Sequence, residues 1–405
     1  MKKLELLAPC GNFGKLQTAL YFGADAVYLG GKNFSLRSYS DNFTDDELSS
    51  AVKYVHENGK KVYVTANIFA KNADFVYLGE YLKYLDFIGV DAVIASDPGV
   101  ISLVLKSCPD LHVHVSTQAN TLNKYSAKFW ADLGAKRIIL ARELSLSEIK
   151  EIRDYLPDEV EIETFCHGAM CISYSGRCLL SDYFSGRPSN RGECVQSCRW
   201  NYSLREKSSD GDYYDITEDE KGTYILNSKD LNMISYLDKM YDAGITSLKI
   251  EGRMKSEYYV ATVVNAYRRA IDDFYKKGSA YKIDPLFENE ILKTNHRAFT
   301  TAFCLGENSQ TVNYADSQSI GERTFTALVL DYDKKNKTAL IEMRNRFGIG
   351  DRLEVLSPSY SFNKIIVVSD LRDVNGNVVS DAKLVQQRLL LKTDVALNKG
   401  DILRK

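Results

Sequence analysis

The sequence lacks long hydrophobic runs and has no excess of positive charge. No stretch approaches the 18 or more apolar residues of a membrane-spanning helix, the nearest being the short run at 100–105. The 405 residues include 52 Lys or Arg and 54 Asp or Glu, and a net charge of −2 excludes a chain-wide cationic field for unspecific nucleic-acid binding. Glu5 interrupts the apolar start and Pro9 ends it, so we expect no signal peptide. These features predict a soluble, cytoplasmic protein without membrane contact, in which any nucleic-acid contact is local.

Three common catalytic motifs are also absent. The chain has no H-E-x-x-H zinc-protease helix, no G-x-S-x-G nucleophile elbow and no G-x-x-x-x-G-K-[ST] phosphate loop. The commonest protease and nucleotide-hydrolase functions are therefore disfavoured.

Residues 1–280 alternate short apolar runs with amphipathic stretches, which is the pattern of βα repeats. One predicted helix starts near Asp45, and Ser145 with Glu148 forms a capping box that opens another. The predicted strands are 4–9, 26–30, 61–68, 92–96, 111–117, 137–141, 161–165 and 247–250. Eight such units favour an α/β fold of the TIM-like (β/α) barrel type, with a doubly wound open sheet as the alternative.

Two segments depart from this pattern. Residues 171–227 separate the seventh strand from the next helix, and an insertion of that length in a compact domain usually has a function. Residues 281–405 change to short alternating strands at 325–332, 338–343, 351–356, 364–368 and 389–392, with turn residues between them. We expect a small C-terminal antiparallel β-barrel domain.

The insertion contains four of the eight cysteines. Cys171, Cys178, Cys194 and Cys198 have the spacing C-x6-C-x15-C-x3-C. In a reducing compartment such a group indicates metal or redox chemistry, and four thiolates complete either a zinc site or an iron–sulfur cluster. Only the second pair has the close spacing of a zinc knuckle, which favours a cubane (4Fe–4S) cluster and leaves zinc open.

Polar side chains gather where the predicted strands end. Since the carboxyl ends of parallel strands meet at one face, we expect these side chains to share a site. Arg142 and Arg253 are suited to clamp a carboxylate-bearing metabolite, unless they form ion pairs with Glu143 or Glu251. The candidates are Asn67, Gln118, Asn120, Arg142, His167, Glu251 and Arg253.

Aromatic residues and arginines alternate between residues 174 and 202. Stacking rings combined with guanidinium groups are how proteins hold unpaired bases, so the insertion is a candidate for local RNA contact. The alternative is that these rings cover the metal site. The aromatic residues are Tyr174, Tyr183, Phe184, Trp200 and Tyr202.

These motifs resemble the peptidase U32 family. The resemblance rests on residues 163–171 (ETFCHGAMC), 176–181 (GRCLLS) and the Cys194–Cys198 pair, with further blocks at 7–11, 116–120 and 248–253. Cys10 departs from the small residue expected in the first block, which leaves open an extra ligand or a redox role.

The resemblance implies that the four cysteines bind the cluster and that the chain is a hydroxylase. The branch of similar size uses prephenate as co-substrate and forms 5-hydroxyuridine at the wobble position of the tRNA anticodon loop. The family also implies three alternatives, namely a collagenase-like peptidase and hydroxylases acting on ribosomal RNA or on a quinone precursor. We expect His167 and Glu251 as catalytic groups and Lys249 as a third contact to the carboxylates. Nothing in the sequence identifies an electron donor.

Overall fold

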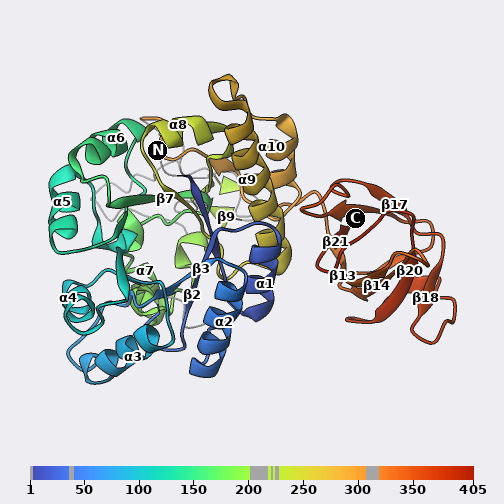
Figure 1. The fold of residues 1–405 in the computed structure, drawn as a ribbon, viewed down its shortest axis with the longest axis horizontal. Coiled ribbons are helices and arrows are strands. Elements are labelled where there is room, and N and C mark those ends of the chain that lie inside the picture. Colours follow the sequence, from blue (N-terminus) through green and yellow to red (C-terminus); the bar gives the residue numbers. More distant parts are fainter. Residues whose placement is uncertain (1–2, 36–40, 201–217, 220–221, 224–227, 307–318) are drawn as a thin grey trace, which may run out of the picture.

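The computed structural model describes residues 3–35, 41–200, 218–219, 222–223, 228–306 and 319–405. Tyr202 and much of the second half of the predicted insertion lie outside these residues. Figure 1 shows a ring of helices around a central sheet, with a second, all-β part to one side.

The central sheet is a closed barrel of eight parallel strands. Strand order runs β11-β1-β2-β3-β4-β5-β6-β7, and β11 pairs with both β1 and β7. The predicted TIM-like barrel is therefore confirmed, and the open doubly wound sheet is wrong. The barrel strands are β1 (Glu5–Pro9), β2 (Ala26–Gly30), β3 (Lys61–Thr65), β4 (Ala92–Ala95), β5 (His112–Val115), β6 (Arg137–Ile139), β7 (Glu161–Ala169) and β11 (Ser247–Ile250).

The two helices predicted from capping and periodicity form at the expected positions, as α2 and α6. Thr44 and Glu47 make a reciprocal capping box at the start of α2, and Ser145 and Glu148 do so at α6. Leu48, lying on the apolar face of α2, is fully buried against the barrel. The helices are α1 (Phe13–Tyr21), α2 (Asp45–Glu57), α3 (Phe75–Phe87), α4 (Pro98–Ser107), α5 (Lys124–Asp132), α6 (Leu146–Tyr155), α7 (Leu180–Ser185), α8 (Leu237–Asp242), α9 (Glu257–Lys277) and α10 (Pro285–Leu292).

Strand β7 is longer than predicted, and its extension carries two short strands. Past Phe165 it continues to Ala169 and pairs antiparallel with β10 (Asp230–Asn232), which in turn pairs with β12 (Phe299–Thr300). Helix α10 also packs against α9 of the barrel. Residues after 280 thus still contribute to the barrel, and the antiparallel sheet starts at Phe325.

The C-terminal part is an antiparallel half-barrel with its own core, as the change of pattern predicted. Its seven strands run in the order β17-β16-β21-β13-β14-β20-β18, and a short β15–β19 pair accompanies them. The strands are β13 (Phe325–Asp333), β14 (Thr338–Met343), β15 (Phe347–Gly348), β16 (Arg352–Leu356), β17 (Ile365–Val367), β18 (Leu371–Asp373), β19 (Asp381–Ala382), β20 (Arg388–Lys392) and β21 (Ile402–Arg404).

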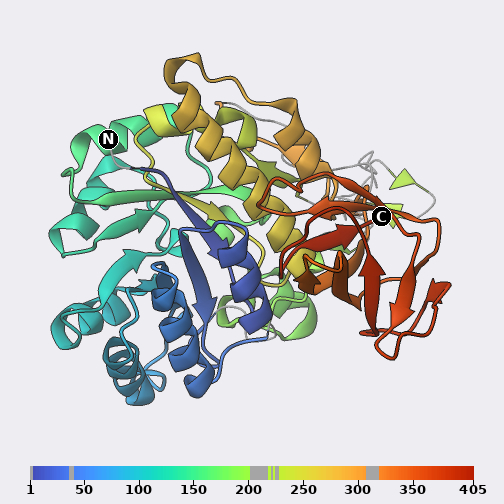
Figure 2. The ribbon, with the colours of Figure 1, turned by 45° about the vertical axis from the view of Figure 1, so that its right-hand side comes forward.

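A buried ion-pair network joins this half-barrel to the helical ring. The fully buried guanidinium of Arg404 lies 2.6 Å from Glu290 of α10 and 2.5 Å from Glu354 of β16. Because unpairing a buried charge is costly, this network fixes the half-barrel beside α9 and α10, as Figure 2 shows.

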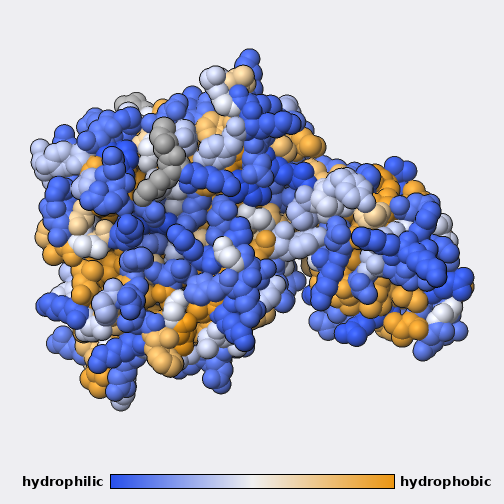
Figure 3. Space-filling model, viewed as in Figure 1, coloured by the Kyte–Doolittle hydropathy of each residue, from blue (hydrophilic) through white to orange (hydrophobic). Residues whose placement is uncertain are grey.

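The face seen in Figure 3 is mostly hydrophilic, with small separate apolar patches. Within the described ranges, no helix combines the length and apolar character needed to cross a bilayer.

Candidate functional site

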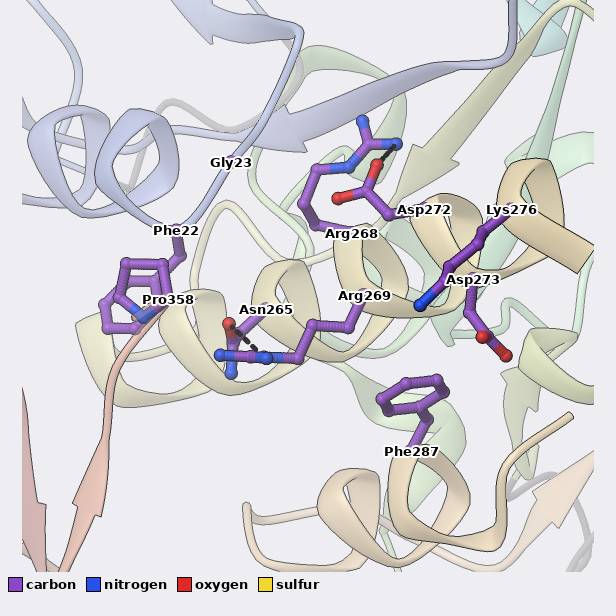
Figure 4. A pocket seen from close by; sticks show the side chains of 10 residues that line it. All are labelled: Phe22, Gly23, Asn265, Arg268, Arg269, Asp272, Asp273, Lys276, Phe287 and Pro358. Atoms are coloured by element: carbon purple, nitrogen blue, oxygen red, sulfur yellow. Dashed lines mark hydrogen bonds and ion pairs between the residues drawn. The ribbon is translucent and has the colours of Figure 1, made fainter. Parts of the chain in front are cut away.

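Two hollows of similar size lie in different surroundings. One, of about 460 Å³, lies outside the barrel between α9, α10 and Pro358, and Figure 4 shows its side chains. The charges there are largely used within the fold, because Arg268 pairs with Asp25 and Asp272 while Arg269 donates to two carbonyls of the half-barrel.

The other hollow, of about 430 Å³, lies at the carboxyl ends of the barrel strands, beneath the cysteine-rich insertion. In this fold that end carries the chemistry. Of the twelve residues singled out from the sequence, ten line this cavity, while His167 and Asn120 do not.

All four cysteines of the insertion face this cavity. Three of their sulfurs accept a backbone N–H from the residue two positions further on, at 3.4 Å in each case: Ser173 to Cys171, Leu180 to Cys178 and Gln196 to Cys194. Such hydrogen bonds stabilise a thiolate and tune a metal bound to it. The donor set therefore fits a thiolate-bound metal group.

The thiols of Cys171 and Cys178 are linked to each other. Their mutual hydrogen bond lowers the pKa of Cys178 and raises the pKa of Cys171, and burial raises the pKa of Cys198. In the described part of the chain, no three His, Cys, Asp or Glu side chains surround a point where one metal ion would sit. The other cysteines lie elsewhere: Cys10 and Cys166 are fully buried in the barrel, away from the cavity wall.

The insertion is fastened to the barrel mouth by polar contacts. Glu143 accepts hydrogen bonds from the backbone N–H of Ser175 (2.7 Å) and from its hydroxyl (3.1 Å). Arg177 donates to the carbonyl of Gln118, and Arg191 pairs with Asp74 at 3.0 Å. Glu143 is thus occupied by the insertion.

Arg142 lies on the cavity wall above the ring of Phe165. Its guanidinium carbon is 3.8 Å from the ring centroid, and one nitrogen donates to the carbonyl of Ala169 at 2.9 Å. Glu251 is 3.9 Å away, a loose ion pair rather than a bidentate one. The position of Arg142 is thereby fixed.

Arg253 and Lys249 lie deeper than Arg142. Arg253 is 3% exposed and donates to the hydroxyls of Ser35 and Thr65 at 2.9 Å. Lys249 is 2.9 Å from the fully buried Glu163, and its ammonium lies over the ring of Tyr28. Both residues line the cavity.

Two further cations on the wall, Arg199 and Lys255, had not been singled out as anion-binding residues. Burial lowers the pKa of Lys255, with Asp230 opposing and Arg297 reinforcing the shift. Lys255 is two residues beyond Arg253 in the sequence, and the turn after β11 brings both into the cavity. Five cationic side chains then face the cavity, and Glu251 is the one carboxylate among the described residues lining it.

Asn67 and Gln118 add neutral polar groups to the same wall. Their amides hydrogen-bond to each other at 3.4 Å. Asn120, two residues further, has a left-handed backbone (φ 62°) and ends the short helix η1 (Thr117–Ala119) outside the cavity.

His167 is buried behind the cavity. It is 1% exposed, with the rings of Tyr259, Tyr267 and Phe299 at 6.1, 5.6 and 5.6 Å between centroids. Burial lowers its pKa to about 4, so the imidazole is neutral near pH 7. His167 does not line the cavity.

A bulge in β7 places Glu251 at the cavity. The pairing of β7 with β11 shifts register between Lys249 and Ile250, and the N–H of Glu251 then donates to the carbonyl of His167 at 2.8 Å. Gly168 has φ +106°, and a Cβ there would lie 2.4 Å from the carbonyl oxygen of Glu251. Only glycine permits this approach without a shift of the main chain.

Comparisons with known proteins place the chain among defined relatives. The sequence profile described as peptidase family U32 matches residues 11–314, and that of the U32 C-terminal domain matches 322–404. "tRNA hydroxylation protein P1" of Bacillus subtilis is 40% identical, with 100% of this chain and 95% of that protein covered. "tRNA hydroxylation protein P" of Escherichia coli is 38% identical, with 90% of this chain and 88% of that protein covered. "23S rRNA 5-hydroxycytidine C2501 synthase" of E. coli is 34% identical over 74% of this chain and 45% of that protein.

Proposed function

The chain belongs to peptidase family U32, and we propose that it is a tRNA hydroxylase that forms 5-hydroxyuridine at the wobble position. Relatives named for hydroxylation of tRNA and ribosomal RNA support an RNA substrate. Prephenate as co-substrate and an iron–sulfur cluster on Cys171, Cys178, Cys194 and Cys198 are parts of the same proposal.

The observation that carries the proposal is that one cavity wall holds both the four sulfurs and five cations. A dicarboxylate such as prephenate matches a cationic site with a single opposing carboxylate. A thiolate-bound metal group beside that site would lie close to the bound metabolite.

The wall residues divide into two binding roles. Arg142, held over Phe165, and Arg253, held by two hydroxyls, are preorganised to orient the two carboxylates, with Lys249 below them. The amides of Asn67 and Gln118 offer donors and acceptors of the kind that pair with a uracil edge.

Glu251 is the proton acceptor in this proposal. It lies on the wall, whereas His167 is neutral and enclosed by aromatic rings. A carboxylate at this position is placed to take up a proton released by the bound substrate.

When bound, an iron–sulfur cluster would supply electron transfer. The chain's own contribution is to hold the four sulfurs, donate backbone N–H groups to three of them and place Arg142 and Arg199 nearby. These cations offset the negative charge of thiolate ligands.

Metal analysis of protein purified without oxygen tests the cluster. We expect iron and acid-labile sulfide with broad visible absorbance, lost when any one of the four cysteines becomes serine. A colourless protein with stoichiometric zinc would contradict the assignment.

Mass spectrometry of tRNA nucleosides from a deletion strain tests the reaction. We expect 5-hydroxyuridine and its derivatives to disappear. If tRNA is unchanged while 23S rRNA loses a hydroxylated base, the substrate is ribosomal RNA instead. Cleavage of a collagen-derived peptide by the metal-loaded protein, abolished by Glu251→Gln, would favour the peptidase alternative.

A further inference from the structure

Three aromatic side chains are clustered on the outer face of the cysteine-bearing segment. Tyr183 and Phe184 lie on α7 with ring centroids 5.1 Å apart, and Phe184 is 6.4 Å from Trp200. Their exposed fractions are 82%, 45% and 44%. The helix α7, labelled in Figure 1, packs against the short helix η4 (Ser197–Arg199), which leads into Trp200.

Rings that only covered the metal site would be buried, whereas each of these three keeps at least 44% of its surface exposed. Single exposed apolar residues are ordinary on protein surfaces and need no explanation. Here three neighbouring rings, with Leu179 also 71% exposed, present one aromatic surface.

Two residues of this surface directly follow residues of the cavity wall in the sequence. Leu179 follows Cys178 and Trp200 follows Arg199, and both Cys178 and Arg199 line the cavity wall. The aromatic side chains therefore lie within a few residues, along the protein chain, of side chains that line the cavity. A single-stranded RNA that stacks on the rings would have its next nucleotides near the cavity.

The charge of the segment suits a polyanion. Residues 171–200 contain four arginines and two acidic residues, although the whole chain is slightly acidic. One of these arginines, Arg191, is paired with Asp74 of the barrel, and the segment still has an excess of positive charge. Aromatic rings next to arginines on a locally positive surface are how single-stranded nucleic acid is held, since every base has a face that can stack.

We propose that Tyr183, Phe184 and Trp200 form a stacking platform for unpaired bases of an RNA substrate at the cavity mouth. This inference rests on the proposed RNA hydroxylation and adds the residues that hold the nucleotides around the target base. Stacking is indifferent to sequence, so the platform positions the RNA while the cavity selects the base.

The two tryptophans of the chain allow a direct test. Trp200 is on the platform, whereas Trp130 is 8% exposed on α5. Titration with a single-stranded uridine oligoribonucleotide should quench the Trp200 share of the emission. Trp200→Phe should remove the quench and keep binding within about 3-fold by fluorescence anisotropy of labelled RNA, since phenylalanine also stacks.

The affinity of variants for the oligonucleotide then tests whether the aromatic ring at position 183 contributes to binding. Tyr183→Ala should weaken oligonucleotide binding roughly 5- to 100-fold, the loss expected for one stacked base, and Tyr183→Phe should restore it. Phe87→Ala is the matched control, because Phe87 is 87% exposed and ends α3 next to the start of β4, at the amino ends of the barrel strands. It should bind like the wild type.

Equal affinity of Tyr183→Ala and wild type would overturn the platform, as would equal quenching by a duplex RNA of the same length. Binding of RNA by the purified protein does not require hydroxylation. Loss of the platform and loss of the proposed reaction therefore give different results in these titrations and in the deletion strain.

Discussion

Replacing His167 by Phe should reduce the loss of unfolding free energy that this protein suffers as the pH is lowered. The imidazole is 1% exposed, and burial lowers its pKa from 6.5 to about 4. As pH falls, His167 is therefore protonated in the unfolded chain at a higher pH than in the folded chain. The stability that the neutral ring contributes is complete above about pH 6.5 and is lost progressively down to about pH 4.

The shift gives the size of the effect. A difference of about 2.5 pKa units between the unfolded and the folded chain lowers the free energy of unfolding, relative to neutral pH, by roughly 3 kcal/mol below pH 4 and by roughly 2 kcal/mol at about pH 5. A phenyl ring cannot be protonated, and the three aromatic rings around His167 give it apolar neighbours.

Urea unfolding of wild type and His167→Phe, followed by circular dichroism at about pH 7 and pH 5, measures this difference. The wild type should lose ~2 kcal/mol more than the variant, because the other titrating groups are common to both. Equal losses would refute the reasoning. Since the imidazole does not reach the cavity, the variant should also retain hydroxylation, whereas a catalytic His167 would make it inactive.

Three other substitutions test the cavity. Lys249→Met leaves the buried Glu163 with Arg137 as its remaining cation. We expect the free energy of unfolding to fall by about 3 kcal/mol, and adding Glu163→Gln should recover part of this loss. No loss would mean that the ion pair is dispensable for stability. Arg142→Ala should weaken prephenate binding roughly 10- to 100-fold by calorimetry, while Arg346→Ala in the half-barrel leaves it unchanged, and equal affinities would end the clamp. Gly168→Ala should abolish hydroxylation by displacing the neighbouring main chain, so a fully active variant would contradict the close approach seen here.

The barrel was predictable because its strands carry a strong local signal. Continuous apolar runs such as Ala92–Ala95 are buried on both faces, which is the pattern of a parallel sheet, and capping residues such as Ser145 mark the helix starts. The sequence favoured a closed barrel over an open sheet, and only the pairing of β11 with β7 established the closure.

The extension of β7 was not predictable by the same means. The pairing of His167, Gly168 and Ala169 with β10 depends on residues more than sixty positions away, and β10 itself (Asp230–Asn232) is short and polar at both ends. The bulge that places Glu251 lies in the pairing of β7 with β11, whose residues are more than eighty positions apart in the sequence.

The site was predictable in its membership more than in its geometry. Cysteine spacing and strand-end position selected most of the residues that share the cavity. The burial of His167 and the partnership of Lys249 with Glu163 could not be foreseen, because they depend on which rings and carboxylates the barrel places beside them.

Complementation of a deletion strain tests the central claim most directly. The wild-type gene should restore 5-hydroxyuridine in tRNA, measured by nucleoside mass spectrometry, and Cys171→Ser, Cys194→Ser and Glu251→Gln should not, although each protein is expressed and folded. Full restoration by the cysteine variants would contradict the account, because hydroxylation would then not depend on the thiolate wall of the cavity.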